Sequence, residues 1–320
     1  MNIKIISRDE ALKIAPQWPA DVSFSEVFGR LHTVRHGFKS GYVLVDSGRG
    51  KLIFPIQWGN GFAYSVHKGH TMPYNIGGAF DKPQWSDIAK EVRRLTKANL
   101  YIADLAVTEE MADGLSRLPS AVFIIDTASH NLETVFSSFN KTTRNLIRRS
   151  QEQNFRIETI SGVMPERYYE LYISHQLSMG TPPRAKEYFD EVANIFDSGF
   201  VIIGAYDGDR LVGMNLFWTT DNGLWLSINS SVAEYGPRHV NYLLYYETIR
   251  WACEHKINRI DLGGSPTRDG NVHNVFKLGF GATMVPLYRL TAGSFSARLV
   301  DKFRRKKRAA LIRLNKLWKN

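Results

Sequence analysis

A repeated order of short apolar segments constrains this chain more than any other feature. Residues 41–69, GYVLVDSGRGKLIFPIQWGNGFAYSVHKG, place such segments between turn signals at 46–50 and 59–61. This pattern is typical of an antiparallel meander. A helical stretch, WSDIAKEVRRLTKA at 85–98, and a strand-like LYIADLAV at 100–107 follow. The first half therefore reads strand, strand, strand, helix, strand.

The second half repeats this order. Residues 199–231, GFVIIGAYDGDRLVGMNLFWTTDNGLWLSINSS, predict three strands joined at Asp207-Gly208 and Asp221-Asn222-Gly223, both typical hairpin turns. An amphipathic stretch at 238–254 and the strand RIDLGG at 259–264 come next. Two helices, at 165–178 and 185–196, precede the strands. We therefore expect an α/β protein of mixed α+β type, with two tandem domains that each hold a mixed sheet flanked by helices.

We place the domains at 1–135 and 136–295, with a basic tail at 296–320. The 320 residues are long enough for two ordinary domains, and 43% are hydrophobic, which allows a substantial core. The single cysteine, Cys253, lies within a predicted helix and is expected to be a buried apolar residue. A chain that needs no disulfide fits the cytoplasm, and no run approaches about 18 apolar residues.

The positive charge is concentrated in the tail. Residues 296–320 hold ten of the 41 Lys and Arg residues and one of the 31 acidic residues, so that the rest of the chain carries 31 basic and 30 acidic groups. Drawn as a helix, the tail gathers apolar side chains on one side with cations around them. This pattern favours an anionic membrane surface or RNA as a partner, or a solvated basic terminus without a specific partner.

Two segments are candidates for a ligand site. The segment EYGPRHVN at 234–241 opens the predicted helix, and a helix N-terminus offers unpaired N–H groups to an anion. Gly236 permits a close backbone approach, Arg238 adds a cation beside this helix start, and Asn241 lies in its first turn. Ordinary helix capping is the alternative interpretation. At its other end, the helix is followed by DLGGSPTRDGNVHNVFKLGFGA at 261–282.

In that second segment, Asp261 lies within the strand and Gly263-Gly264 allow a sharp exit. Lys277 lies between Phe276 and Phe280, in a stretch too apolar for an ordinary surface loop. A lysine in such a place can stabilise a developing oxyanion or bind a phosphate. A lysine that extends its ammonium group to the solvent is the alternative.

The first domain offers HKGHTMPYNIGGAF at 67–80, where Tyr74, Gly77 and Gly78 form a turn that can line a pocket. Its two histidines lack a third ligand nearby, so we expect no metal site. The sequence shows no P-loop, Rossmann glycine fingerprint or nucleophile elbow, which argues against the commonest ATP-, NAD- and serine-dependent chemistries.

Taken in order, five motifs resemble a known family: PYNIGG, NKTTRNLIRRS, SMGTPPRAKEYFDEV, the segment from YGPRHVN to DLGGS, and FKLGFGA. The chain resembles the FemAB-like branch of the GNAT-fold acyltransferases, in particular members associated with exosortase and exopolysaccharide gene clusters. This resemblance implies two GNAT-like domains. FemAB-like enzymes transfer an amino acid from aminoacyl-tRNA to an amine of a peptidoglycan precursor, whereas other GNAT-fold relatives use acyl-CoA.

The resemblance also implies roles for particular residues. Lys277 matches the Phe-Lys segment and is expected to stabilise charge on the reacting carbonyl. The candidates for the base, taken from the residues themselves, are Asp261 and His239, with substrate phosphate or water as alternatives. The donor- and substrate-binding residues are expected to be Tyr235, Gly236, Arg238, Asn241, Gly264, Ser265, Phe276, Tyr74, Gly77, Gly78, Arg144 and Arg148. Unlike CoA-binding relatives, the chain has no full Arg/Gln-x-x-Gly-x-Gly loop before the 238–254 helix.

We therefore expect a FemAB-type N-acyltransferase without a tightly bound cofactor, whose co-substrate is aminoacyl-tRNA or acyl-CoA. The acceptor is expected to be an amine of a cell-envelope, peptide or glycan precursor, including lipid-linked ones. The alternatives are an acyl-CoA-dependent O- or N-acyltransferase of exopolysaccharide synthesis and a non-catalytic scaffold on a membrane or RNA. The expected location is the cytoplasm, including the inner face of the membrane.

Overall fold

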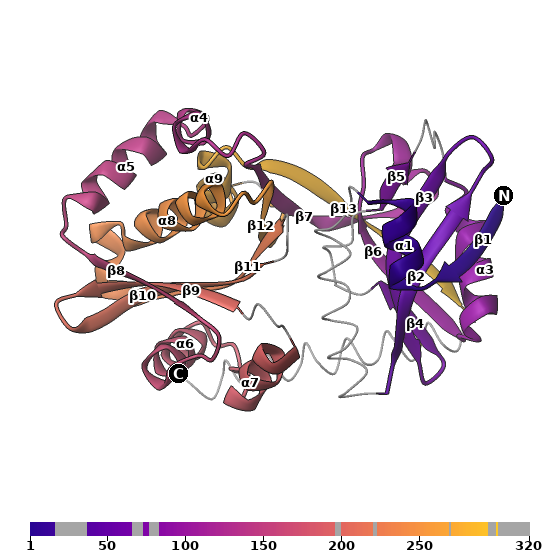
Figure 1. Cartoon of the computed structure of the whole chain (residues 1–320), viewed down its shortest axis with the longest axis horizontal. Coiled ribbons are helices and arrows are strands. Elements are labelled where there is room, and N and C mark those ends of the chain that lie inside the picture. The colour runs from indigo at the N-terminus through magenta and orange to yellow at the C-terminus, as the bar shows by residue number, and fades with distance from the viewer. Residues whose placement is uncertain are drawn as a thin grey trace. The chain divides into compact units, whose positions relative to one another are not determined.

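The computed structural model describes residues 1–16, 37–65, 73–76, 83–195, 200–219, 223–268, 270–293 and 299. These residues form two compact units (Figure 1). Unit 1 holds the described residues of 1–123, 264–274 and 284–299, and unit 2 holds those of 124–263 and 275–283. The predicted domain boundaries stay a prediction.

Unit 1 is built on a mixed sheet. Its strands follow one another in the order β1 (Asn2–Ile6), β2 (Lys39–Asp46), β3 (Lys51–Gly59), β4 (Phe62–Ser65), β6 (Leu100–Ala106) and β13 (Thr283–Gly293), and β5 (Tyr74–Ile76) pairs with β3. Its helices are α1 (Arg8–Ile14), α3 (Trp85–Thr96) and the 3₁₀ turn η1 (Glu110–Ala112). Strands β4 and β6 are parallel because α3 lies between them in the chain. The chain leaves unit 1 in β7 (Ser116–Asp126).

Unit 2 repeats the plan. Its strands follow the order β12 (Arg259–Pro266), β11 (Gly223–Ser231), β10 (Arg210–Thr219), β9 (Phe200–Asp207) and β8 (Arg156–Ser161). Figure 1 shows α5 (Lys141–Gln151) and α8 (Val240–Glu254) on one side of this sheet, and α6 (Glu166–Ser178) and α7 (Lys186–Ile195) on the other. The remaining described elements are α4 (Leu132–Ser137), the 3₁₀ segment η2 (Ala233–Arg238) and α9 (Val272–Gly279), which belongs to unit 2 from Val275 on.

The mixed α/β fold class is confirmed. Both halves contain the predicted three strands, helix and strand, and in unit 1 the short strand β5 stands in addition between β4 and α3. The predicted hairpin at Asp207-Gly208 joins β9 to β10, and Gly208 adopts the positive φ of 58° that such a turn needs. The second predicted turn, at 221–223, and the basic tail lie outside the described residues, apart from Gly223 and Leu299. The sequence analysis missed β1 and α1, although Ser7 and Glu10 form a capping box at the start of α1.

Glycines allow helices to approach the sheet of unit 2 closely on both faces. A Cβ on Gly213 of β10 would lie 2.9 Å from Leu244 of α8, and one on Gly204 of β9 would lie 2.4 Å from the Tyr168 hydroxyl of α6. Of the residues expected to face the core from α8, Val240, Leu243, Leu244 and Ala252 are buried, and Trp251 is half-buried. Cys253 is buried, as expected.

The core of unit 1 packs α3 against the sheet and contains a buried ion pair. Trp85, Ile88 and Val92 of α3 join Phe54 of β3 in one cluster. At the end of the β4–β6 pairing, the Asp104 backbone N–H donates to Ser65 Oγ at 3.1 Å. Asp104, itself buried, accepts two hydrogen bonds from Arg289 of β13, at 2.5 and 2.6 Å. This bidentate geometry compensates the buried carboxylate.

Among the described residues, no helix is long and apolar enough to cross a membrane.

The buried pair in unit 1 makes a stability prediction. Replacing Arg289 by Ala leaves Asp104 buried without its cation, so we expect the free energy of unfolding to fall by about 3 kcal/mol. Lys90→Ala, which removes an exposed ion pair with Asp87, is the control and should change it by less than about 0.5 kcal/mol. Chemical denaturation of both variants measures the difference. Equal decreases in the free energy of unfolding would show that the buried Asp104–Arg289 pair stabilises the protein no more than the exposed pair does.

Candidate active site

Strands β11 and β12 of unit 2 pair over a short distance only. The two strands are parallel, and their register runs from Gly223↔Arg259 to Trp225↔Asp261 and ends there. Strand β11 continues for six more residues, to Ser231, without pairing to β12. An opening between two parallel strands exposes backbone groups at the carboxyl ends of the strands, where α/β proteins commonly bind ligands.

The backbone of β12 turns sharply where this pairing ends. Gly263 has a φ of +79°, a conformation that favours glycine over residues with a Cβ. The Asp261 carboxylate stabilises the turn, since its Oδ1 accepts a hydrogen bond from the Gly263 N–H at 2.7 Å. Asp261 is buried, and the turn directs the Gly263 carbonyl toward α9.

Lys277 of α9 reaches this turn. Its Nζ donates to the Gly263 carbonyl at 3.0 Å, and its side chain is only 8% exposed. Burial lowers the pKa of Lys277 to about 8, although the negative charge of Asp261 acts in the opposite direction. The sequence-based candidates Lys277 and Asp261 are therefore brought together. A lysine with this pKa can hold or release a proton near neutral pH.

Aromatic packing fixes the end of α9 that carries Lys277. The Phe276 ring lies 4.9 Å from that of Tyr242 and 4.8 Å from that of Tyr245, both on α8. Phe280, fully buried, packs against Phe276 at 5.1 Å. On the other side, the Gly279 carbonyl accepts a hydrogen bond from the Asn140 N–H at 3.0 Å at the start of α5. The position of the lysine is thus set by α8 and α5 together.

A chain of polar side chains holds the start of α8 over the sheet. Asn229 of β11 donates through Nδ2 to Asn241 Oδ1 at 3.2 Å and to Asn215 Oδ1 at 2.8 Å. Asn215 of β10 in turn donates to Thr248 Oγ1 at 3.0 Å. Because the Asn241 oxygen is used in this chain, its Nδ2 is the end that can donate to a ligand. His239 precedes α8 with a φ of +59° and forms no side-chain cap.

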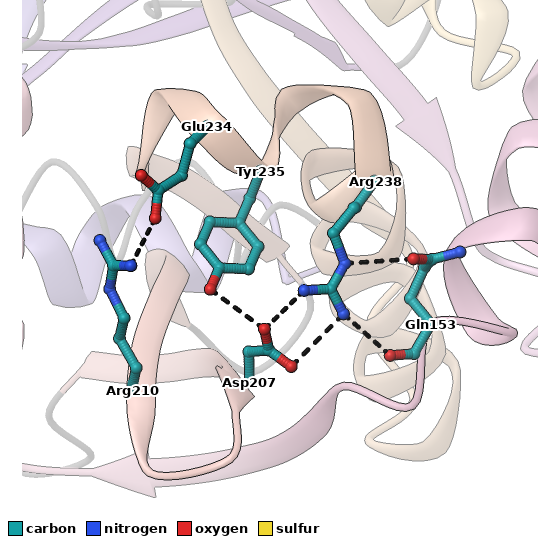
Figure 2. Close-up of polar contacts among 6 residues, drawn as sticks. All are labelled: Gln153, Asp207, Arg210, Glu234, Tyr235 and Arg238. Carbon is teal, nitrogen blue, oxygen red and sulfur yellow. Dashed lines mark hydrogen bonds and ion pairs between the residues drawn. The ribbon is translucent and has the colours of Figure 1, made fainter.

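Arg238 and Tyr235 bind other protein groups rather than pointing to an open space (Figure 2). Arg238 donates to Asp207 through Nη1 at 2.5 Å and through Nη2 at 3.3 Å, and to the Gln153 carbonyl at 3.1 Å. The Tyr235 hydroxyl donates to Asp207 at 3.0 Å. The hydrogen bonds from Arg238, and then that from Tyr235, lower the pKa of Asp207. This network ties η2, and thus the start of α8, to β9.

The predicted basic helix is α5. The Arg144 Nη1 donates to the carbonyls of Ser137, at 3.0 Å, and Phe139, next to the end of α4. The exposed Arg148 lies over the Phe136 ring, 5.9 Å from its centroid. The structure thus joins both arginines to the α4 region.

The other predicted residues lie elsewhere. Tyr74 is half-buried on β5 of unit 1, Gly264 is exposed, and buried Ser265 accepts a hydrogen bond from Asn271 at 3.5 Å, all within unit 1. Gly236 is exposed in η2. Gly77 and Gly78 lie outside the described residues.

Sequence reasoning missed Asn215 and Asn229, which hold Asn241. The signal that could have found them is a polar residue within an otherwise apolar strand, as in GMNLFW and WLSINSS. Within the described parts of the chain, no group of three His, Cys, Asp or Glu side chains could hold a metal ion.

Comparison with known proteins agrees with this geometry. Residues 137–273 match the family model described as an acetyltransferase (GNAT) domain. The crystal structure of FemX is 12% identical with a TM-score of 0.62, and the match covers 90% of this chain and 97% of that chain. L-PGS from Bacillus licheniformis is 10% identical with a TM-score of 0.53, covering 93% of this chain and 96% of that one.

A third similar structure is the C-terminal domain of a protein named as a lysylphosphatidylglycerol synthetase from Agrobacterium fabrum. It is 13% identical with a TM-score of 0.54, covering 92% of this chain and 94% of that one. A search of curated protein sequences found no significant match. The chain carries a GNAT domain, and the protein is an acyltransferase. The FemAB-like resemblance is confirmed for the GNAT domain and for a fold similar to that of FemX.

The burial of Lys277 predicts a pH dependence of stability. Its pKa is about 8 in the folded protein, below its ordinary value of 10.5. Below about pH 8 both states hold the proton, and the folded state bears the full cost of the buried charge. Between about pH 8 and 10.5 the unfolded state binds more protons, so stability rises with pH.

We therefore expect the free energy of unfolding of the wild type to increase relative to that of Lys277→Met across this window. Urea denaturation at a series of pH values measures the difference between the two proteins. A difference that stays constant from pH 7 to 10.5 would contradict the burial of a titrating lysine.

The network of Figure 2 predicts a local effect of Arg238. Because Arg238 ties η2 to Asp207 and Gln153, Arg238→Ala should increase hydrogen exchange of the backbone amides from Tyr235 to Leu243. Arg117→Ala is the control, since Arg117 forms an exposed pair with Glu109 that does not involve η2. If both variants exchange like the wild type, the start of α8 is held by other contacts.

Proposed function

We propose that the protein is a FemAB-type N-acyltransferase, which transfers an aminoacyl or acyl group from an activated donor to an amine of a cell-envelope, peptide or glycan precursor. One observation carries this proposal. The buried Lys277 binds the Gly263 carbonyl where β11 and β12 cease to pair. Gly263 lies within the residues that match the GNAT domain, and Lys277 follows the end of that match.

The open strand edge supports a site for the donor. Beyond Trp225, β11 has no pairing to β12 in the described chain, and its backbone groups can accept an extended donor segment as another strand would. The start of α8 faces the same sheet, and helix N-termini favour phosphate groups. Both acyl-CoA and the 3′ end of aminoacyl-tRNA carry phosphates.

The proposed reaction needs no covalent enzyme intermediate. The acceptor amine attacks the carbonyl carbon of the donor, so that a C–N bond forms and the carbonyl oxygen gains negative charge. The tetrahedral intermediate then expels the leaving oxygen of tRNA or the sulfur of CoA, which takes up the proton lost by the amine. Alignment of the two substrates can supply about 7–11 kcal/mol in the best cases.

Lys277 is the residue that we assign to charge stabilisation. Its ammonium group can donate a hydrogen bond to the developing oxyanion, and in a buried site such a donor is stronger than in water. Its lowered pKa also suits the transfer of a proton to the leaving group.

The base is Asp261 or His239. Asp261 lies beside Lys277 but also holds the Gly263 turn, which gives it a positioning role in addition. His239 stands at the start of α8, half-buried, with its ring 6.0 Å from that of Tyr242. A base must remove the proton from the acceptor ammonium or from the attacking nitrogen.

The fold supports aminoacyl-tRNA as the first candidate donor. The FemAB-like resemblance implies this donor, the fold is similar to that of FemX, and the Agrobacterium protein is named as a lysylphosphatidylglycerol synthetase. The second candidate is an acyl-CoA-dependent O- or N-acyltransferase of exopolysaccharide synthesis, which the description of the family model as an acetyltransferase favours. The η2 segment before α8 has the sequence AEYGPR and contains no full Arg/Gln-x-x-Gly-x-Gly loop, which favours the first candidate over the second.

The test combines binding with turnover. Thermal-shift titrations of the full chain with acetyl-CoA, other acyl-CoAs, charged tRNA and uncharged tRNA identify the donor class. A shift with charged but not uncharged tRNA supports aminoacyl transfer, and a salt-resistant shift with an acyl-CoA supports the second candidate. No shift with any donor would favour the non-catalytic scaffold.

With the donor identified, Lys277→Ala should lower kcat by about 100-fold, the usual loss of an oxyanion donor. His273→Ala is the matched control, since His273 is an exposed residue of the same helix. Turnover is followed as release of the free thiol or of labelled amino acid in the presence of amine acceptors. Unchanged kcat in a folded Lys277→Ala protein would refute the role of this lysine.

A further inference from the structure

Helix α9 buries two polar side chains and exposes aliphatic ones, while Phe276 packs inward against α8. Its buried positions include Asn274 and Lys277, whereas Val272, Val275 and Leu278 are 73%, 64% and 47% exposed. These three residues are spaced by three, so they lie on one face of the helix. A surface helix normally shows the opposite arrangement, with apolar residues inside and polar residues outside.

The packing of unit 2 explains the buried lysine on the inner side of α9 but not the aliphatic residues on its outer side. Lys277 is buried because it binds the turn of β12, as described above. Nothing in the packing of the described residues requires aliphatic side chains on the outer side, where polar residues would cost less in water. Aliphatic residues gathered on an exposed helix face are typical of a surface that contacts an apolar partner.

A helix with a basic outward side, α5, begins beside the end of α9. The end of α9 touches the start of α5, where the Asn140 N–H donates to the Gly279 carbonyl and the Gly279 backbone packs on Thr143. Thr143, Ile147 and Ser150 of α5 are buried, so Lys141 and Arg148, which are seven residues apart, lie on its outward side and are exposed. The sequence of α5 contains four cations and no acidic residue.

We propose that the exposed face formed by Val275 and Leu278, together with Lys141 and Arg148, docks on the surface of an anionic lipid bilayer. Aliphatic side chains enter the boundary between headgroups and acyl chains, and cations bind the anionic headgroups. RNA would match the cations but not the aliphatic face, because proteins bind RNA through charge, aromatic stacking and polar contacts. An anionic bilayer offers both anionic headgroups for the cations and an apolar boundary for the aliphatic side chains.

The aliphatic part of the docking surface, Val275 and Leu278, lies on the exposed side of the same short helix that buries Lys277. Docking therefore places the inferred active site of unit 2 within one helix diameter of the membrane, about 10 Å. The inference concerns binding alone and holds whichever donor the enzyme uses.

The experiment is vesicle flotation with the full chain, using phosphatidylcholine vesicles with and without phosphatidylglycerol. Val275→Gln/Leu278→Gln is the main variant, because glutamine keeps a high helix propensity while removing the apolar surface. Leu177→Gln/Met179→Gln is the matched control, since these residues of the α6 region are 41% and 53% exposed in the same unit. Circular dichroism confirms that all variants fold.

We expect the main variant to bind phosphatidylglycerol vesicles about tenfold more weakly and the control to bind like the wild type. Lys141→Gln/Arg148→Gln should weaken binding to these vesicles by about fivefold per charge and leave the weaker binding to neutral vesicles unchanged.

Three outcomes would overturn the proposal. Equal vesicle binding by the wild type and the main variant would assign membrane binding, if any, to the basic tail. A change from dimer to monomer in the main variant, seen by light scattering without loss of vesicle binding, would assign the face to a second copy of the chain. Loss of tRNA binding with intact vesicle binding in the α5 variant would assign its cations to RNA.

Discussion

The burial of Lys277 is the constraint on which the rest of unit 2 depends. A lysine that is 8% exposed must have a partner for its ammonium group, and the Gly263 carbonyl provides it. That carbonyl is in place because Gly263 adopts a positive φ and Asp261 holds the turn. The aromatic contacts of Phe276 with α8 then fix the helix that carries the lysine. The energetic cost of the buried charge is consistent with a functional site, where strain and perturbed pKa values concentrate.

The two units share an order of strands and helices but differ in the cation that lies beside a buried carboxylate. Each contains three strands, a crossover helix and a strand that pairs in parallel over three positions. In unit 1 a buried carboxylate near the end of this pairing, Asp104, is neutralised by the two hydrogen bonds of Arg289. In unit 2 the comparable place holds Asp261 with a lysine whose pKa lies near 8. An arginine cannot release its proton, whereas such a lysine can, and for this reason the proposed function assigns the chemistry to unit 2.

Several features of the site could be predicted from particular residues. Lys277 stood out because two phenylalanines flank it, and the Gly263-Gly264 pair indicated a sharp exit from the strand. Arg238 shows where this reasoning fails. A cation beside a helix start suggests an anion site, but its partner, Asp207, is 31 residues away in the sequence and is brought near only by the β9–β10 hairpin. The role of Asn229 was also missed, because it depends on hydrogen bonds to Asn215 and Asn241, which lie on other elements of the fold.

The sequence by itself determined the three strands, helix and strand that recur in both halves, the resemblance to the GNAT class through the order of its motifs, and the presence of a lysine in an apolar segment. These properties depend on local periodicity, turn residues and motif order, which are all properties of neighbouring residues. Only the tertiary structure decided which side of α9 is buried and where β11 and β12 separate. Those properties depend on contacts between residues far apart in the chain, and the eight residues of α9 are too few for periodicity to show that its lysine points inward and its Val and Leu side chains outward.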